Sequence, residues 1–213
     1  MPTVPFEVPA TMGVFPAILK NITLIGLFGL QHSIMARQSF KKSWTKIIPA
    51  YLERSVYVLI SGLLCVLIIW QWAQIDGVLW SMAAGSTGFY VMRGIFFFGV
   101  FFLLSSSFLI NHFELFGLQQ GYENLIGKDG AKPTFKEIAY YKIVRHPIYL
   151  GFLMIIWATP HMSYSHLALA ALMTIYIVIG SAYEEKDLGV VFGQTYADYK
   201  KRVPGLIPFT KLG

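Results

Sequence analysis

Residues 95–110 read IFFFGVFFLLSSSFLI, a run without a single charge, and this stretch decides the fold class. It belongs to an apolar window over about 87–110 whose one charged residue is Arg93. The hydrocarbon core of a bilayer is about 30 Å thick, and a helix needs about 20 apolar residues to cross it. The window is therefore predicted to cross a membrane as one α-helix.

Other windows have the same character, but one of them is short. The apolar stretch over 148–159 holds about a dozen residues and reaches spanning length only when it is extended back to Tyr140. The segment TPHMSY (159–164) then predicts the turn of a helical hairpin. The sequence predicts an all-α integral membrane protein with five transmembrane helices, the last two forming a hairpin, over about 15–35, 55–72, 87–110, 140–159 and 164–183.

The composition supports this class and excludes two others. Of the 213 residues 55% are hydrophobic and only 13% are charged, with a mean hydropathy of +0.57. Soluble domains carry about 25% charged residues, and a chain this apolar does not remain disordered in water. The single cysteine, Cys65, can form no intramolecular disulfide and no cysteine-based metal cluster. We expect one transmembrane domain over 1–213.

The positions of the basic residues explain the net charge of +6. Fifteen of the 17 Lys and Arg residues follow the first, third and fifth predicted helices, whereas the linkers 73–86 and 160–166 contain none. Short cytoplasmic loops collect Lys and Arg. The pattern predicts an N-terminus outside and a cytoplasmic C-terminal segment, as in a bacterial inner membrane. Because the basic excess reports topology, we expect no nucleic-acid partner.

Polar and ionisable residues collect at the predicted cytoplasmic ends of all five helices. Such residues are costly near a bilayer and are functional candidates by default. An Arg-His pair opens the fourth helix and a Glu pair closes its antiparallel neighbour, which predicts a mixed-charge cup suited to a zwitterionic ligand. The residues at this level are Gln31, His32, Glu53, Arg54, Asn111, His112, Glu114, Arg145, His146, Glu184 and Glu185.

The C-terminal third carries three motifs in order: YKIVRHPIYLG (141–151), the pair Glu184-Glu185, and FGQTYADYKKRVP (192–204). They resemble the signature of the isoprenylcysteine carboxyl methyltransferase-like membrane methyltransferases. One departure is Ala139, where a glycine often precedes this tyrosine, which puts the backbone shape of the loop in question. The resemblance implies that S-adenosylmethionine binds over about 139–205, at Tyr141, Arg145, His146, Pro147, Tyr149, Gly151, Glu184, Glu185 and Arg202.

The N-terminal half narrows the resemblance. The segments LQHSIMAR (30–37), ERSVY (53–57) and NHFELFGL (111–118) look like those of the bacterial methanethiol S-methyltransferases. The resemblance implies that a small volatile thiol, methanethiol, is methylated to dimethyl sulfide by direct in-line transfer from a sulfonium to a thiolate. Membrane lipid would surround the pocket, and the thiol would reach it through the bilayer.

The chemistry of a thiol suggests roles for four polar residues. A model thiol has a pKa of about 8.5 and must ionise before it attacks, which a nearby base or cation makes easier. Our hypothesis is that His32 or His112 takes the proton or positions the thiol, while Arg54 and Asn111 orient it. A dry pocket that aligns the two sulfur atoms would supply rate through orientation and desolvation.

Alternative functions remain open at this stage. The nearest is a carboxyl or lipid methyltransferase of the isoprenylcysteine type. A haem- or metal-binding membrane protein would use His32 and His112 as ligands, but no metal-type spacing such as HExxH is present, so we expect no metal. A transporter would show inverted repeats, which are not visible. The sequence does not reveal the oligomeric state.

Overall fold

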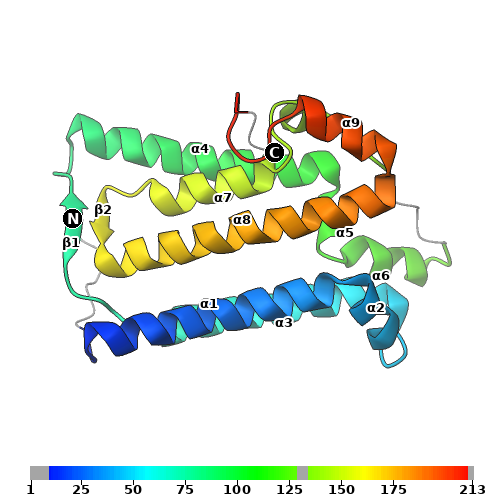
Figure 1. The fold of residues 1–213 in the computed structure, drawn as a ribbon, viewed down its shortest axis with the longest axis horizontal. Coiled ribbons are helices and arrows are strands. Elements are labelled where there is room, and N and C mark those ends of the chain that lie inside the picture. The colour runs from blue at the N-terminus through cyan, green and yellow to red at the C-terminus, as the bar shows by residue number, and fades with distance from the viewer. Residues whose placement is uncertain (1–9, 129–133, 211–213) are drawn as a thin grey trace.

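Four long helices form the body of the protein. The structure is a computed structural model that describes residues 10–128 and 134–210. Within these residues, four helices are long and apolar enough to cross a membrane, and they run side by side along the long axis of the molecule (Figure 1). They confirm four of the predicted spans and are α1 (Val14–Ala36), α3 (Glu53–Gln71), α4 (Thr87–Ile110) and α8 (Tyr164–Phe192).

The short elements lie at the two ends of these helices, except for α7, which runs alongside α4. Short helices, among them α2, α5, α6 and α9, gather at one end, and a small antiparallel ribbon of β1 and β2 lies at the other (Figure 1). The short elements are α2 (Gln38–Trp44), η1 (Ala50–Leu52), β1 (Val78–Ser81), α5 (His112–Leu115), α6 (Leu118–Leu125), η2 (Ala139–Lys142), α7 (Pro147–Trp157), β2 (His161–Ser163) and α9 (Gln194–Arg202).

The helix expected over 140–159 is shorter in the structure. It begins at Pro147 and ends at Trp157, so its 11 residues rise about 16 Å, well short of the bilayer core. The reason is Pro147 itself, because a proline ring fits the first turn of a helix but not its interior. The structure therefore supports four spanning helices, with α7 as a shorter apolar helix.

Two glycines explain how α7 packs against α4. A Cβ atom added at Gly151 would lie 2.9 Å from the backbone nitrogen of Leu103, and one at Gly99 would lie 2.9 Å from the Cβ of Met154. Neither helix therefore has room for a side chain at the crossing. The close approach places α7 between α4 and α8, and it fixes the start of α7 at the end of the bundle that carries the short helices (Figure 1).

The polar residues inside the first span join α1 to the end of α3. The Asn21 side chain is fully buried, donates to the Ala73 carbonyl at 2.9 Å and accepts from the Ala73 amide at 2.9 Å. Lys20 donates to the Gln71 side chain at 3.1 Å. These bonds satisfy backbone groups left free where α3 ends, which stabilises the α1–α3 pair.

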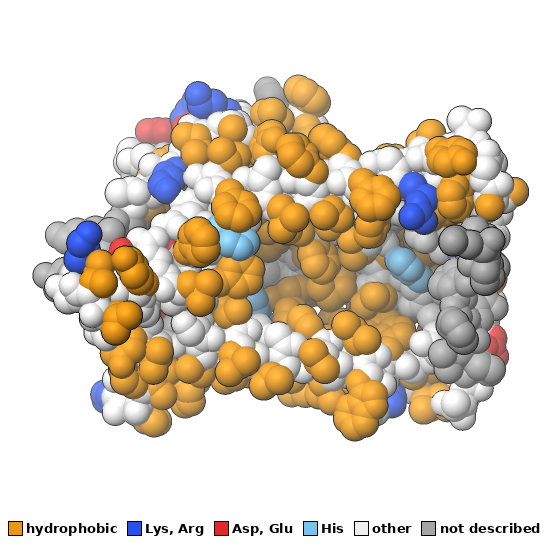
Figure 2. All heavy atoms as spheres, turned by 180° about the vertical axis from the view of Figure 1, so that it is seen from behind, with side chains coloured by type: hydrophobic (Ala, Val, Ile, Leu, Met, Phe, Trp, Pro, Cys, Tyr) orange, Lys and Arg blue, Asp and Glu red, His pale blue; other side chains and the backbone are white. Residues whose placement is uncertain are grey.

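The outer surface of the bundle is apolar. On α4 the side chains of Phe97, Phe101 and Phe108 are each more than half exposed, as are Ile69 and Trp70 on α3. Figure 2 shows a largely hydrophobic face with charged side chains towards its ends and a hollow between the upper and lower rows of helices. Apolar surface of this extent is typical of a protein embedded in lipid.

The β-ribbon occupies the position where the sequence predicts a simple hairpin turn. Trp80 pairs with Met162 in the antiparallel register, and the Trp80 indole donates to the Thr159 carbonyl at 3.0 Å. The amide of Tyr164 donates to Gly77, whose positive φ of 117° suits a glycine. The ribbon thus ties the loop before α4 to the loop before α8.

Ala139 adopts a conformation that favours glycine, with φ at 44°. A left-handed backbone costs an L-residue about 1–2 kcal/mol. We expect Ala139→Gly to raise the melting temperature in detergent by about 3 °C, because the relieved strain outweighs the added chain entropy. The same change at Ala197, an exposed position inside α9, should lower it. A lower melting temperature for Ala139→Gly would contradict the expectation.

Candidate active site

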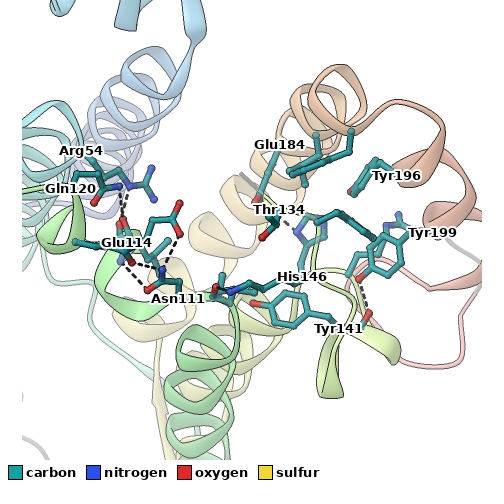
Figure 3. Close-up of a pocket in the computed structure, with 18 of the residues that line it drawn as sticks. Arg54, Asn111, Glu114, Gln120, Thr134, Tyr141, His146, Glu184, Tyr196 and Tyr199 are labelled. Carbon is teal, nitrogen blue, oxygen red and sulfur yellow. Dashed lines mark hydrogen bonds and ion pairs between the residues drawn. The ribbon is translucent and has the colours of Figure 1, made fainter. Parts of the chain in front are cut away.

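A cavity of about 580 Å³ lies at the end of the bundle where the short helices gather, and Figure 3 shows it. Its volume falls within the range of about 300–1,000 Å³ typical of small-molecule pockets. One wall comes from the start of α3 and the region of α5 and α6. The opposite wall comes from the loop before α7, the last part of α8, and α9 (Figure 3).

The first wall is organised by Asn111, which ends α4. Its positive φ of 149° breaks the helix, and its side-chain oxygen accepts from the Glu114 amide at 3.3 Å and so caps α5. Its amide group donates to the Glu114 carboxylate at 3.0 Å and also to Gln119. Arg54 donates from Nε to the Leu115 carbonyl at 2.8 Å. Arg54 and Asn111 are thereby held in fixed positions at the cavity (Figure 3).

Gly117 allows this wall to form. Its φ is 79°, and a Cβ atom there would lie 2.5 Å from the backbone nitrogen of Ser55. The Ser55 hydroxyl donates to the Gly117 carbonyl at 3.0 Å. Only a glycine therefore lets the turn between α5 and α6 rest directly on the first turn of α3, beside Arg54.

The opposite wall places an imidazole beside a carboxylate. His146 directly precedes α7, and its Nδ1 lies 3.5 Å from Oε2 of Glu184 on α8. The Glu184 side chain is 44% exposed whereas the His146 side chain is only 5% exposed, and both line the cavity. The wall is completed by Tyr141 and by Tyr199, whose hydroxyl donates to the Tyr141 carbonyl at 2.6 Å. The predicted Arg-His and Glu pairs are thus brought together.

Arg145 and Glu185 form a buried network behind this wall. The Arg145 side chain is 2% exposed, and its Nη2 lies 2.6 Å from Oε1 of Glu185. Its Nη1 donates to the carbonyls of Lys200 and Val203. Its backbone amide donates to the Pro204 carbonyl at 2.8 Å. The guanidinium therefore fastens the chain after α9 to the start of α7, and its donors are used within the protein.

His146 links the cavity to this network. Its Nε2 lies 3.1 Å from Oε1 of Glu185, so both ring nitrogens face carboxylates. Burial alone would lower the pKa of His146, but its hydrogen bonds with Glu184 and Glu185 raise it to about 9. The imidazole is therefore protonated at neutral pH and places a positive charge beside Glu184.

This raised pKa makes stability depend on pH. A group whose pKa is higher in the folded protein stabilises it fully below its ordinary pKa of about 6.5, and the contribution is lost as the pH rises through about 9. At 1.36 kcal/mol per pH unit this interval corresponds to about 3 kcal/mol. We expect the melting temperature to fall between pH 7 and 10, and the fall to be much smaller in His146→Gln. Equal slopes for the two proteins would contradict this origin.

Of the thirteen residues that the sequence assigned to catalysis or cofactor binding, six line the cavity and seven do not. Pro147, Tyr149 and Gly151 lie within α7, and Glu185 lies in the buried network. Arg202 pairs with Glu137 on the exposed surface, with Nη2 2.9 Å from Oε2. The residues that line it are Arg54, Asn111, Tyr141, Arg145, His146 and Glu184.

The two histidines expected to act on a thiol occupy different surroundings. His112 stacks on Phe108 at a centroid distance of 4.2 Å, and its Nδ1 lies 2.8 Å from the Ser107 hydroxyl. His32 lies between α1 and α3, with Nε2 2.5 Å from the Tyr57 hydroxyl. Neither ring lines the cavity, but Tyr57 lies directly below Arg54, whose guanidinium carbon is 5.0 Å from the Tyr57 ring centroid.

The cavity also contains polar residues that the sequence did not single out. The Gln120 Oε1 and the Tyr196 hydroxyl are buried and have no hydrogen-bond partner within the described parts of the chain. Buried polar atoms of this kind are rare unless a ligand or water satisfies them. The signal for Tyr196 was its place in the FGQTYADYK segment, whereas nothing in the sequence pointed to Gln120. Both residues line the cavity, so a small rotation of either side chain would bring its unpaired atom to a polar ligand there.

The fold and the site together define a helical membrane protein with a mixed-charge pocket at one end of its bundle. A family model described as NnrU protein matches residues 22–186. The chain is similar to Methanethiol S-methyltransferase 1 of Bradyrhizobium diazoefficiens, at 45% identity over 92% of this chain and 68% of the relative.

Two further relatives carry the same name. The Crocosphaera subtropica protein is 44% identical over 91% of this chain and 75% of its own, and the Mycobacterium tuberculosis protein is 41% identical over 97% and 84%. No solved structure matches this chain. The chain belongs to the NnrU family and, within it, to the methanethiol S-methyltransferases, and it is therefore a methyltransferase.

Proposed function

We propose that this protein transfers a methyl group from S-adenosylmethionine to methanethiol and releases dimethyl sulfide. The observation that carries the proposal is the cavity, where Glu184 and protonated His146 face Arg54 and Asn111 in one pocket, in a chain whose relatives are named for this reaction. The charges of both signs suit a ligand that carries an amine and a carboxylate.

The donor set of the cavity fits S-adenosylmethionine. When bound, this cofactor supplies an electrophilic methyl group on a sulfonium. His146 and Glu184 would hold its charged amino-acid end, and the unpaired atoms of Tyr196 and Gln120 would take up further polar atoms. Tyr141 would contribute to the same wall. Arg145, Glu185 and Pro147 would support these residues from behind, through the network and the start of α7.

The charges of the two reactants determine which kind of pocket favours the reaction. A sulfonium and a thiolate cancel their charges on the way to products, so water would stabilise the reactants more than the transition state. A pocket that excludes water and holds the reacting atoms in line would therefore raise the rate. We propose that methanethiol arrives from the bilayer through the hollow between the helix rows (Figure 2). In this proposal the cavity faces the cytoplasm of a bacterial cell, as the placement of basic residues suggests.

The hollow also supports a second candidate, a lipid or prenyl substrate, because a wide lateral opening would admit a long chain. The test is an assay of detergent-purified protein with labelled S-adenosylmethionine against methanethiol, hydrogen sulfide and a farnesylcysteine analogue. We expect dimethyl sulfide by gas chromatography from methanethiol and no methylation of the analogue. Methylation of the analogue alone would overturn the proposal in favour of the second candidate, and no binding of S-adenosylmethionine would overturn both.

A haem-binding function can be tested with the same sample. In the described residues, no group of three or more His, Cys, Asp and Glu side chains is placed to hold a metal ion. Two histidine ligands would suffice for haem, so an absorption spectrum of the purified protein is the deciding measurement. A Soret band would revive this function.

A further inference from the structure

A buried pair of side chains lies one helical turn below the cavity. Tyr57 follows Arg54 by three residues on α3, so the two lie on the same face of the helix. The Tyr57 residue is 5% exposed, and its hydroxyl lies 2.5 Å from Nε2 of His32 on α1. Arg54, which lines the cavity, covers the Tyr57 ring. The pair therefore lies directly behind Arg54, which separates it from the cavity.

Ser61 fixes which nitrogen of His32 carries the proton. The Ser61 hydroxyl donates to the Tyr57 carbonyl at 2.8 Å, and its alternative acceptor is the Gln31 side-chain oxygen at 3.3 Å. In both cases the Ser61 oxygen is left to accept from Nδ1 of His32 at 3.2 Å. Nδ1 therefore carries the hydrogen, and Nε2 is the free acceptor. The Tyr57 hydroxyl must then donate to Nε2, which leaves the lone pairs of its oxygen for another donor.

Aromatic rings enclose the pair. Phe28 stacks on His32 at a centroid distance of 5.3 Å, and Tyr176 on α8 presents an edge contact at 6.3 Å. A Cβ atom at Gly29 would lie 3.0 Å from the Tyr176 ring, so a glycine is needed for this ring to close in. The immediate neighbours of the pair are thus aromatic rings, with the Arg54 guanidinium on the side of the cavity. A neutral thiol, which is apolar and a weak donor, lies against such rings at a lower cost than an ion does.

We propose that Tyr57 and His32 act as one proton acceptor for the thiol, with Tyr57 in contact with the substrate. The inference rests on the proposed function and names the residue that meets the S–H group. The S–H bond breaks as its proton passes to the Tyr57 oxygen, and the original Tyr57 proton passes to Nε2 of His32. The products of this step are a thiolate and an imidazolium, so charge and protons balance. Arg54, beside Tyr57, stabilises the thiolate.

Other charged groups face this pair and enter its pH dependence. Arg54 and Glu53 act on it from α3, and Glu184 acts on it from α8. Among the described residues, Tyr149 and Tyr176 also interact with Tyr57, and Cys65 interacts with Tyr176. None of these groups lies closer to Nε2 of His32 than the Tyr57 hydroxyl, at its hydrogen-bond distance of 2.5 Å.

Tyr57→Phe tests the pair because it removes the hydroxyl and keeps the ring that contacts His32 and Arg54. We expect kcat/KM for methanethiol at pH 7 to fall about 100-fold, the usual scale for a lost acid-base group, with the affinity for S-adenosylmethionine kept. As the pH rises and more methanethiol ionises in solution, kcat/KM of the variant should increase about tenfold per pH unit. The wild type should not show this slope. Tyr90→Phe, the matched change at an exposed tyrosine near the start of α4, should stay within twofold.

A double substitution separates a joint role from two structural roles. If the two residues act as a unit, His32→Ala and Tyr57→Phe combined should cost no more than about the larger single loss. The proposal is overturned if the loss of kcat/KM in the double variant equals the product of the two single losses. It is also overturned if kcat/KM of Tyr57→Phe stays within twofold of wild type. If Tyr57→Phe fails to bind S-adenosylmethionine, the test is made with His32→Ala instead. A loss of kcat/KM under twofold in His32→Ala overturns the proposal. A wild type that makes no dimethyl sulfide overturns the proposed function itself.

Discussion

Glu184→Gln is expected to weaken the binding of S-adenosylmethionine by about 10- to 100-fold. The Glu184 carboxylate faces the cavity and is 44% exposed there, so the amide fits without disturbing the packing of α8. The substitution removes the negative charge that would bind the cofactor's amine, and a hydrogen bond to a charged group contributes about 1.5–3 kcal/mol. Isothermal titration calorimetry on detergent-purified protein measures the effect.

The matched control is Asp187→Asn, three residues further along α8. Asp187 pairs with Arg37 at 3.3 Å, and both side chains are partly exposed outside the cavity. Exposed ion pairs contribute little, so this variant should bind the cofactor like the wild type and melt at nearly the same temperature. A Glu184→Gln protein with a Kd within threefold of wild type would remove Glu184 from the binding site.

Hydrophobicity alone predicted the long helices because their length and apolar composition are local properties. The window 87–110 coincides with α4, whose bounds are Thr87–Ile110. The last window ends at 183, whereas α8 continues to Phe192, because its final turns carry the charges that form the site. Composition marks the part of a helix that contacts lipid, and it does not mark where the helix ends.

The features that the sequence did not predict depend on contacts between distant segments. The ribbon pairs Trp80 with Met162, and each of its strands is too short to show an alternating pattern. The shortening of α7 could be predicted from the sequence, since a proline such as Pro147 fits the first turn of a helix but not its interior. The helix was extended back to Tyr140 because its apolar stretch was otherwise too short to span a membrane. The structure shows that it begins at Pro147, as the geometry of proline requires.

The sequence predicted that charged residues gather at one site. It did not predict which of them line the cavity and which support its wall. Helix ends at one level placed Arg54, His146 and Glu184 near one another, and the structure brings them to one cavity. The sequence could not show that Arg145 uses its donors on the chain after α9, because that contact joins residues 55 and more positions apart. Likewise, the choice between His32 and His112 depends on Tyr57, which only the packing of α1 on α3 brings to His32.

Replacing the neighbouring carboxylate in Glu185→Gln is expected to lower the stability of the protein and to leave the binding of S-adenosylmethionine unchanged. One carboxylate group of Glu185 meets Arg145 at 2.6 Å, Lys200 at 2.8 Å and His146 at 3.1 Å. Removing its charge leaves the buried Arg145 guanidinium without a counter-ion, and such a loss costs about 3–5 kcal/mol. For a chain of this size we expect the melting temperature in detergent to fall by roughly 10 °C.

Limited trypsin digestion distinguishes this mechanism from a general loss of packing. Arg145 holds the carbonyls of Lys200, Val203 and Pro204, so a misplaced guanidinium should release the chain after α9 before the membrane helices unfold. Cleavage at Lys200, Lys201 and Arg202 should then become faster in Glu185→Gln, whereas it should stay at the wild-type rate in Glu184→Gln. Digestion and melting that match the wild type would show that Arg145 needs no counter-ion here. The two adjacent carboxylates thus make different predictions, because Glu184 faces the cavity as well as His146, whereas Glu185 is the counter-ion of the buried Arg145 guanidinium.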